Sequence, residues 1–408
     1  MSSIRTIIKL CWIALLSVDM SRIYLDNSAT TALCDVAKQA MLQAMESYGN
    51  PSSLHAAGLE AEHMLKQARA QVTSALGVRN GAGQIYFTAS GTEANNLAIL
   101  GSVYAKERRT GNRIVTTEGE HSSVEATLQE LEKKGFEIVR IPTRNGVLDM
   151  DFAQKAIDKN TILVTAMMVN NETGALYDLK TLFALTKRVA PNAVTHCDAV
   201  QGFMKSIFSP AAIGADMLTV SAHKIHGPKG VGALYVSAEI TKAKKLIPII
   251  WGGGQESGMR SGTENVIGIA GFGAACAQAQ GTLRADLVRM TQLRNYLEQK
   301  LAEIDGIALN LPRGNRAPHI VNLTLPDIKS ETMLNYLSDR GICVSSGSAC
   351  ASHGKATSRA LSAFGLPAEK ADCSLRISLC PGNTEAEIEA LCEHLAGGIA
   401  TLVKIHRT

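Results

Sequence analysis

The chain has 408 residues and a formal net charge of +4, and 46% of its residues are hydrophobic against 19% that are charged. This balance is typical of a globular protein and excludes an intrinsically disordered chain. The small net charge gives no reason to expect nucleic acid or a membrane as the main partner. The length exceeds one ordinary domain, so two domains are expected.

The N-terminal residues 1–19 contain an apolar run, from Ile7 to Val18, that is too short to span a bilayer. It could serve as the core of a signal peptide, but no small-residue cleavage site follows it. The stretch MSRIYLDNSATT, which begins at Met20, resembles the natural start of a folded protein. We therefore expect residues 1–19 to be an extension that is not part of the fold.

Short apolar runs rich in β-formers alternate with helical patterns along the chain. They cover residues 84–87, 113–117, 161–169, 193–200 and 216–223. This alternation predicts a mostly parallel sheet with helices on both faces.

A change of pattern suggests where the domains divide. Long helical patterns fill residues 275–300, and a second α/β unit begins at residues 319–325. We therefore predict a large domain over residues 20–281 and a smaller C-terminal α/β domain over residues 282–408. Residues 20–35 could pack with either domain.

The cysteines of the chain number nine and include no C-x-x-C pair. An odd number without the spacing of zinc ligands indicates a reducing compartment, so we expect a cytoplasmic protein without a metal site. Most of these cysteines should be small buried hydrophobes, and one or two at most should be reactive.

Polar, potentially reactive residues follow each predicted strand at its carboxyl end. Ligands of open α/β sheets bind outside the carboxyl ends of the strands, so these residues predict one large shared site. They are Ser90, Gly91, Thr92, Glu120, His121, Asn170, Asn171, Asp198, Gln201, His223 and Lys224.

Four features of these turns together specify pyridoxal phosphate as the cofactor. SGTEANN, from Ser90, would present N–H groups and hydroxyls at a helix N-terminus, which suits a phosphate. Taken alone, the motif is better explained as a plain Ser or Thr helix cap. Asp198 needs a partner, either a cationic ring nitrogen or an internal arginine. His121 could stack on a ring or shuttle a proton. Lys224 follows an apolar strand and should be partly desolvated and nucleophilic, whereas Lys229 should be solvated.

A series of short motifs resembles the NifS/IscS-type (group I) cysteine desulfurases of the class V aminotransferase superfamily. The motifs are YLDNSATT, GNPSSLHAAG, FTASGTEANN, EGEHSSV, VNNETG, DAVQ, SAHKIHGPKG, GGGQESGMRSGTENV and SSGSAC, and the match runs from about Tyr24 to Arg376. The resemblance implies the α/β fold of pyridoxal phosphate-dependent transferases of fold type I, with a mainly parallel seven-stranded sheet in the large domain. It also implies a homodimer with shared sites.

The resemblance assigns a role to each residue of the motifs. Lys224 would form the Schiff base with the cofactor, Asp198 would face its ring nitrogen, and His121 would stack on its ring. The other expected contacts are Asn171 and Gln201 to the phenolic oxygen, Gly91, Thr92, Ser221 and His223 to the phosphate, Thr263 to the phosphate from the other subunit, and Asn50 and Arg376 to the substrate carboxylate.

Cys350 lies in VSSGSACASHG, a run too poor in apolar bulk to pack as core. By itself it could be an incidental cysteine of a surface loop. Beside a pyridoxal phosphate site, its thiolate can attack the sulfur of bound substrate and leave as a persulfide. The resemblance thus implies a sulfurtransferase that converts L-cysteine to L-alanine. Cys350 would pass the sulfur to an acceptor such as an iron–sulfur scaffold, whose cluster it could meet transiently, or to a thiolation pathway.

Two alternative functions remain open for such a sequence. A selenocysteine lyase uses the same cofactor on a related fold, and a sulfur-relay scaffold could retain the fold without turnover. Two positions also depart from the family pattern: Ser257 stands where a basic residue is usual, and Cys380 with Pro381 replaces a Gly-Arg pair. Neither is an expected catalytic position, so these departures bear on dimer or acceptor contacts.

Overall fold

The computed structural model describes residues 22–105, 111–346 and 358–405. The expected extension over residues 1–19 and Cys350 therefore lie outside the described residues. The strands are β1 (Ile23–Tyr24), β2 (Gly83–Thr88), β3 (Arg113–Thr117), β4 (Glu137–Ile141), β5 (Thr161–Met167), β6 (Val194–Asp198), β7 (Met217–Ser221), β8 (Gly232–Ser237), β9 (Ala308–Leu309), β10 (Ile320–Thr324), β11 (Ile342–Cys343), β12 (Ser345–Ser346) and β13 (Ser374–Ser378).

Helices occupy much of the remaining described chain. They are α2 (Asp35–Glu46), α3 (Ala56–Ala75), α4 (Gly91–Ala105), α5 (Ser122–Lys133), α6 (Met150–Ala156), α7 (Leu179–Val189), α8 (Pro210–Ile213), α9 (Ala238–Lys242), α10 (Val266–Ala302), α11 (Ser330–Ser338), α12 (Arg359–Phe364), α13 (Ala368–Asp372) and α14 (Glu385–Ile405), with 3₁₀ turns η2 (Arg144–Gly146), η3 (Ala222–Lys224) and η4 (Glu256–Gly258).

A seven-stranded sheet forms the large domain, in the order β2-β8-β7-β6-β5-β3-β4. β8 is antiparallel to both of its neighbours, whereas β3 to β7 pair in parallel. The predicted mainly parallel sheet of seven strands is confirmed, and all five apolar runs form strands in it. The sequence analysis did not locate β4 and β8. β4 lies at the edge of the sheet and is partly exposed, so charged residues interrupt its apolar pattern, and β8 follows directly on a glycine-rich turn.

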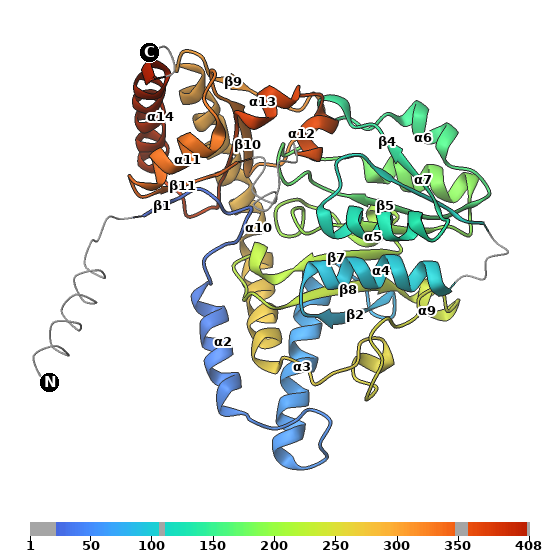
Figure 1. Cartoon of the computed structure of the whole chain (residues 1–408). Coiled ribbons are helices and arrows are strands. Elements are labelled where there is room, and N and C mark those ends of the chain that lie inside the picture. The colour runs from blue at the N-terminus through green and yellow to red at the C-terminus, as the bar shows by residue number, and fades with distance from the viewer. Residues whose placement is uncertain (1–21, 106–110, 347–357, 406–408) are drawn as a thin grey trace, which may run out of the picture.

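Helices lie on both faces of this sheet, as Figure 1 shows. Successive residues of a buried strand point to opposite faces, so each strand contributes to two cores. Ile85 and Phe87 of β2 belong to the core that also contains residues of α3, α7 and α10. Tyr86, between them, belongs to the core that contains residues of α4 and α5.

The small domain is an antiparallel sheet in the order β12-β13-β10-β9, with a core shared by α11, α14 and the second half of α10. β1 pairs in parallel with β11 through Ile23 and Ile342. This part of residues 20–35, which the sequence left open between the domains, therefore contacts the small domain.

α10 runs without a break across the predicted domain boundary at residues 281 and 282. Ile269 and Phe272 of its first half belong to the large core, and Leu293 and Leu297 of its second half belong to the small core. Among the described helices, α10 is long and apolar enough to cross a membrane by length and composition only, and in this fold it packs against α2 and α3. One continuous helix thus links the two cores.

A buried ion pair connects α3 to the turn at η4. The Glu256 carboxylate accepts hydrogen bonds from the Arg69 guanidinium at 2.6 and 2.8 Å and from the backbone N–H of Phe87 at 2.8 Å. The Glu256 side chain is 2% exposed and the Arg69 side chain 33%.

We expect E256A to lower the free energy of unfolding by about 2–3 kcal/mol, because the substitution removes the carboxylate partner of the guanidinium and the acceptor of the Phe87 N–H. Urea denaturation measures this change. The matched control is E62A, which breaks an exposed pair with Lys66 and should shift the midpoint very little. Equal midpoints for the two variants would contradict the prediction.

Candidate active site

A cavity of about 400 Å³ lies at the carboxyl ends of β3, β5, β6 and β7. It is where the sequence predicted one shared site, and residues that are far apart in the sequence meet there. The predicted residues that line it are Ser90, Gly91, Thr92, His121, Asn171, Asp198, Gln201, His223, Lys224 and Arg376.

Lys224 lies on η3, directly after β7. Its Nζ donates hydrogen bonds to the carbonyl oxygens of Ser28 at 2.6 Å and Ala29 at 2.8 Å, and the side chain lines the cavity. Lys229, farther along the same turn, is exposed. Of the two lysines in this stretch, Lys224 is therefore the one whose amine reaches the site.

Asp198 ends β6 and is 6% exposed. One carboxylate oxygen accepts a hydrogen bond from the Asn95 amide at 2.8 Å, and the other accepts one from the backbone N–H of Val200 at 3.0 Å. These donors are neutral, so the negative charge remains available to a cation in the cavity. That arrangement suits a protonated ring nitrogen.

The N-terminus of α4 forms one end of the cavity and suits an anion. Gly91 begins the helix, and a Cβ at this position would lie 3.0 Å from Val200, which is tighter than an ordinary contact, and 3.4 Å from Ser221. Ser221 is 3% exposed, and its hydroxyl has no hydrogen-bond partner among the described residues. A phosphate at this helix end would supply such a partner, so these residues fit a phosphorylated cofactor.

Both histidines of the cavity have a lowered pKa. Burial is the main cause for His121; Lys224 lowers it further, and Asp198 opposes the shift. Burial, followed by Lys224, Lys229 and Lys205, lowers the pKa of His223 to about 4. Both rings are therefore neutral near pH 7. In His121, Nδ1 accepts from the backbone N–H of Ser123 at 3.1 Å, so the ring proton is on Nε2.

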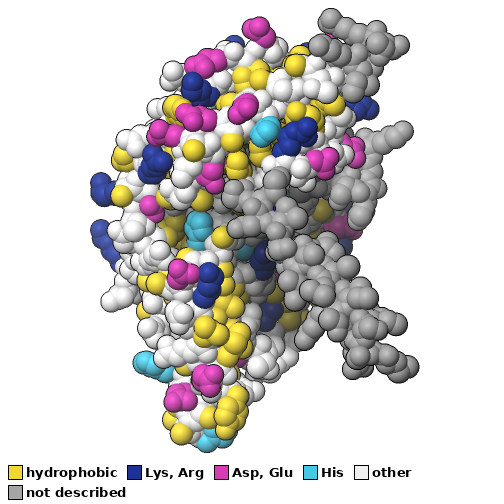
Figure 2. Space-filling view, turned by 90° about the vertical axis from the view of Figure 1, so that its left-hand side faces the viewer, with side chains coloured by type: hydrophobic (Ala, Val, Ile, Leu, Met, Phe, Trp, Pro, Cys, Tyr) yellow, Lys and Arg dark blue, Asp and Glu magenta, His cyan; other side chains and the backbone are white. Residues whose placement is uncertain are grey.

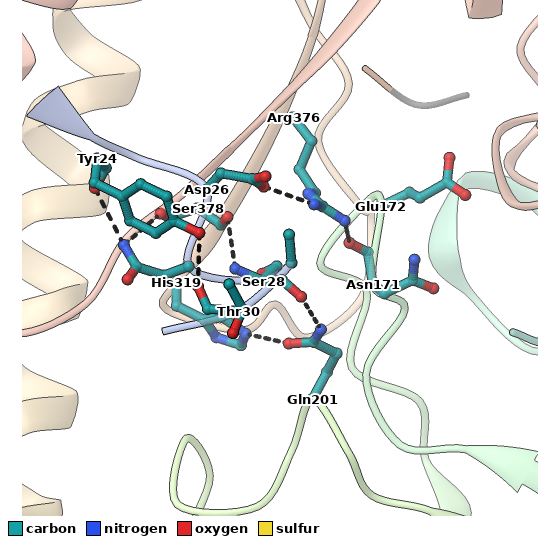
Figure 3. Close-up of polar contacts among 12 residues, drawn as sticks. Tyr24, Asp26, Ser28, Thr30, Asn171, Glu172, Gln201, His319, Arg376 and Ser378 are labelled. Atoms are coloured by element: carbon teal, nitrogen blue, oxygen red, sulfur yellow. Dashed lines mark hydrogen bonds and ion pairs between the residues drawn. The ribbon is translucent and has the colours of Figure 1, made fainter. Parts of the chain in front are cut away.

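Arg376 brings the small domain into the site from β13. Figure 3 shows its guanidinium between Asp26, whose Oδ1 accepts from Nη2 at 2.8 Å, and the carbonyl of Asn171, which accepts from Nη1 at 2.9 Å. Its Nε is buried without a hydrogen-bond partner among the described residues. These contacts hold the plane of the guanidinium at the cavity wall.

Ser221, at the end of β7, does not line the cavity itself, and three other predicted site residues lie outside the cavity or outside the description. Asn50 is exposed, and its side chain accepts from the backbone N–H of Ser52 at 2.9 Å. Thr263 is exposed as well, and neither residue lines the cavity of its own chain. Cys350 falls in residues 347–357, which are not described.

The two departures from the family pattern also lie away from the cavity walls. Ser257 is in η4 with a φ of 56°, next to Glu256 with a φ of 51°. Cys380 follows β13, and its backbone N–H donates to the Asn383 side chain at 2.8 Å. Burial raises the pKa of the Cys380 thiol.

Several lining residues were not predicted from the sequence. Asn95 could have been found, because it lies one helical turn after Gly91 and so on the same face of α4. Ser28 and Ala29 carry no side-chain signal, because they act through backbone carbonyls. Ser345 arrives from the small domain. Only the tertiary structure brings the carbonyls of Ser28 and Ala29 and the side chain of Ser345 to the site.

Glu120 lies directly behind the site, next to His121, and is 5% exposed. Its Oε1 accepts from the Thr117 hydroxyl at 2.5 Å and from the backbone N–H of Met167 at 2.9 Å, which ties the turn after β3 to β5. Burial is the main cause that raises the pKa of this carboxyl from 4.5 to about 8, and the two hydrogen bonds lower it by less than burial raises it. Glu120 is therefore neutral near pH 7.

We expect E120Q to gain stability relative to the wild type as the pH rises from about 5 to about 8. The folded wild type retains a proton on Glu120 that the unfolded chain releases above its pKa of 4.5, so its stability falls through this window, whereas glutamine does not titrate. Urea unfolding of both proteins across this pH range measures the difference. Parallel pH profiles would refute the prediction.

Comparisons with known proteins agree with this geometry. The family model for aminotransferase class-V matches residues 23–391. Cysteine desulfurase IscS of Dictyoglomus turgidum is 39% identical over 360 residues, which cover 88% of this chain and 89% of that protein. Cysteine desulfurase of Nostoc sp. is 39% identical over 378 residues, which cover 92% of each.

Solved structures give the same result. A NifS-like protein from Rickettsia africae has a TM-score of 0.83 and 32% identity, with 93% of this chain and all of that chain covered (100%). SspA in complex with cysteine has a TM-score of 0.75 and 30% identity, with coverage of 88% and 99%. The chain therefore belongs to the class-V aminotransferase family and, within it, to the cysteine desulfurases.

Proposed function

We propose that this protein uses pyridoxal phosphate to convert L-cysteine to L-alanine and keeps the sulfur as a persulfide on Cys350. The observation that carries the proposal is one cavity lined by the Lys224 amine, the Asp198 carboxylate and the Arg376 guanidinium. These groups match the aldehyde and the ring nitrogen of the cofactor and the carboxylate of an amino acid. Relatives named cysteine desulfurase, and SspA solved with cysteine, support L-cysteine as the substrate.

The described residues offer a binding group for each part of the cofactor. Lys224 would hold it covalently and Asp198 would hold its ring nitrogen. Its phosphate would lie against the N-terminus of α4, Thr92, His223 and the unpartnered hydroxyl of Ser221. When bound, pyridoxal phosphate supplies an electron sink for the negative charge that develops on the substrate.

The protein's own groups orient the substrate and move its protons. Arg376 would bind the substrate carboxylate, because Asp26 and Asn171 already hold its guanidinium at the cavity wall. The Lys224 amine would remove the α-proton and return a proton to the product. His121 is neutral with its proton on Nε2, so it can donate there and be reprotonated.

The sulfur step is assigned to Cys350. Its thiolate forms an S–S bond with the substrate sulfur while the C–S bond breaks, and the electron pair of that bond stays with the carbon fragment, which is protonated to alanine. The Cys350 sulfur is oxidised to the persulfide level as the substrate carbon is reduced, so no other oxidant is needed. Before segment 347–357, Ser345 lines the cavity. After it, Ser358 donates at 2.6 Å to Glu172, the neighbour of the lining residue Asn171.

We also propose that the active form is a homodimer that passes sulfur to an acceptor protein, such as an iron–sulfur scaffold, in the cytoplasm. Exposed apolar side chains support the dimer. Leu42 and Met45 lie on α2, Tyr48 and Leu54 lie between α2 and α3, and Trp251 lies between α9 and η4. Figure 2 shows hydrophobic side chains gathered on the lower part of the face that carries α2. A second subunit would cover such a surface.

The first test compares wild type with C350A. We expect C350A to lose alanine and sulfide release from L-cysteine in the presence of a reductant, while it keeps the visible absorbance of the bound cofactor. Cysteine turnover should fall by about a thousandfold or more, because the nucleophile is lost. Retained sulfide release would rule out the role of Cys350. A wild type without cofactor absorbance would favour the sulfur-relay scaffold, and turnover of selenocysteine alone would favour the lyase.

The second test asks whether Thr263 serves the site of the partner subunit. We expect mixed dimers of K224A and T263V to regain about half of the wild-type activity at a limiting cofactor concentration. One of the two sites then combines an intact Lys224 with an intact Thr263 from the other chain. If Thr263 acted within its own chain, the mixture would show no more activity than T263V alone. Homodimers of each variant are the controls.

A further inference from the structure

The side-chain amide of Gln201 is held at both of its polar atoms. Its Nε2 donates to the carbonyl of Ser28 at 2.9 Å. Its Oε1 accepts from Nε2 of His319 at 3.3 Å and from Nζ of Lys205 at 3.5 Å. Figure 3 shows Gln201 between His319 and Ser28. The amide is 5% exposed and lines the cavity.

Lys205 and His319 are buried polar residues whose side chains hydrogen-bond to this amide. Lys205 is 6% exposed and His319 is 0% exposed. Among the described residues, the hydrogen bond of the Lys205 ammonium goes to Gln201, and the second ring nitrogen of His319 has no partner. Burial, and then Lys224, lower the pKa of Lys205 to about 7, which reflects the cost of placing this charge here.

Lys205 and His319 together decide which way the amide of Gln201 points. In its ammonium form, present below the pKa of about 7, Lys205 only donates hydrogen bonds, so the atom that faces it is the carbonyl oxygen. A reversed amide would place its NH₂ group against Lys205 and its oxygen against the carbonyl of Ser28, and both contacts would be repulsive. His319 adds a second donor on the same side, because its ring is neutral and its Nε2 can carry the proton.

The orientation of the Gln201 amide decides whether a hydrogen-bond donor or an acceptor faces the cavity. The NH₂ group has two hydrogens, and Ser28 accepts one of them, so the other is available at the cavity wall. The same Ser28 carbonyl accepts from Nζ of Lys224 at 2.6 Å, which places the amide beside the reactive amine.

We propose that Lys205 and His319 are positioning residues, which keep the N–H side of the Gln201 amide toward the cavity so that a bound ligand must present an acceptor there. The inference rests on the proposed function in one respect: the acceptor is the phenolic oxygen of pyridoxal phosphate. Neither residue touches the ligand. Both act through Gln201.

The test measures the dissociation constants of the apo-protein for pyridoxal phosphate and for 3-deoxypyridoxal phosphate, which lacks the phenolic oxygen. We expect the wild type to prefer the natural cofactor by about tenfold or more, the contribution of a hydrogen bond to a charged oxygen. In K205M and in H319L the preference should fall severalfold toward equality, because the amide is no longer held. H319L also removes the buried ring nitrogen that has no partner, so the substitution should cost little stability. The test therefore remains possible with H319L if K205M fails to fold.

Two controls separate positioning from general damage. Q201L should lower the preference at least as far as K205M does, with Asn171 as the remaining expected contact of the phenolic oxygen. The double variant K205M/Q201L should show no further loss than Q201L. K187M removes another partly buried lysine, which pairs with Asp216 at 2.6 Å away from the cavity, and should keep the full preference. Equal weakening of both ligands in K205M and H319L would overturn the inference and leave the proposed function intact. A wild type that binds neither ligand would overturn the proposed function itself.

Discussion

Residues 25–31 form hydrogen bonds to both domains, and the geometry of the site depends on these bonds. On the small domain, Ser28 donates through its backbone N–H to the hydroxyl of Ser378 at 2.8 Å. On the large domain, Thr31 donates to the carbonyl of His223 at 2.9 Å, and Lys224 donates to the carbonyl of Ser28. This short segment, which contains a turn from Asp26 to Ala29, therefore fixes the position of the reactive amine relative to the small domain.

This segment couples groups that act on different parts of a bound ligand. Asp26 holds the guanidinium of Arg376, and two residues later the carbonyl of Ser28 accepts from both Lys224 and Gln201. A carbonyl oxygen has two lone pairs, so one backbone atom can align two side chains. Arg376, proposed to bind the substrate carboxylate, and Lys224 and Gln201, proposed to bind the cofactor, are thus held by the same short segment. Arg376 belongs to the small domain and the other two to the large domain, so neither domain alone contains the whole site.

Burial also sets the charge state of the site. Desolvation disfavours the charged form of a buried group. It keeps His121, His223 and Glu120 neutral near pH 7, and it lowers the pKa of Lys205. The Asp198 carboxylate accepts hydrogen bonds from two N–H donors. The cavity therefore combines proton donors and acceptors that are uncharged near pH 7 with one carboxylate that can attract a cation. Perturbed ionisable groups in one cavity are typical of active sites.

The sequence by itself determined the local features. Apolar runs predicted five strands of the main sheet, because buried parallel strands need continuous apolar residues. The polar residues after those runs predicted half of the residues that line the cavity, because parallel strands bring their carboxyl ends to one edge. Only the tertiary structure decided which distant groups complete the site. The carbonyls of Ser28 and Ala29, the Asp26–Arg376 pair, and the contact of His319 with Gln201 join residues with no common periodicity. Such contacts depend on how the two domains pack, and no local pattern in the chain encodes that packing.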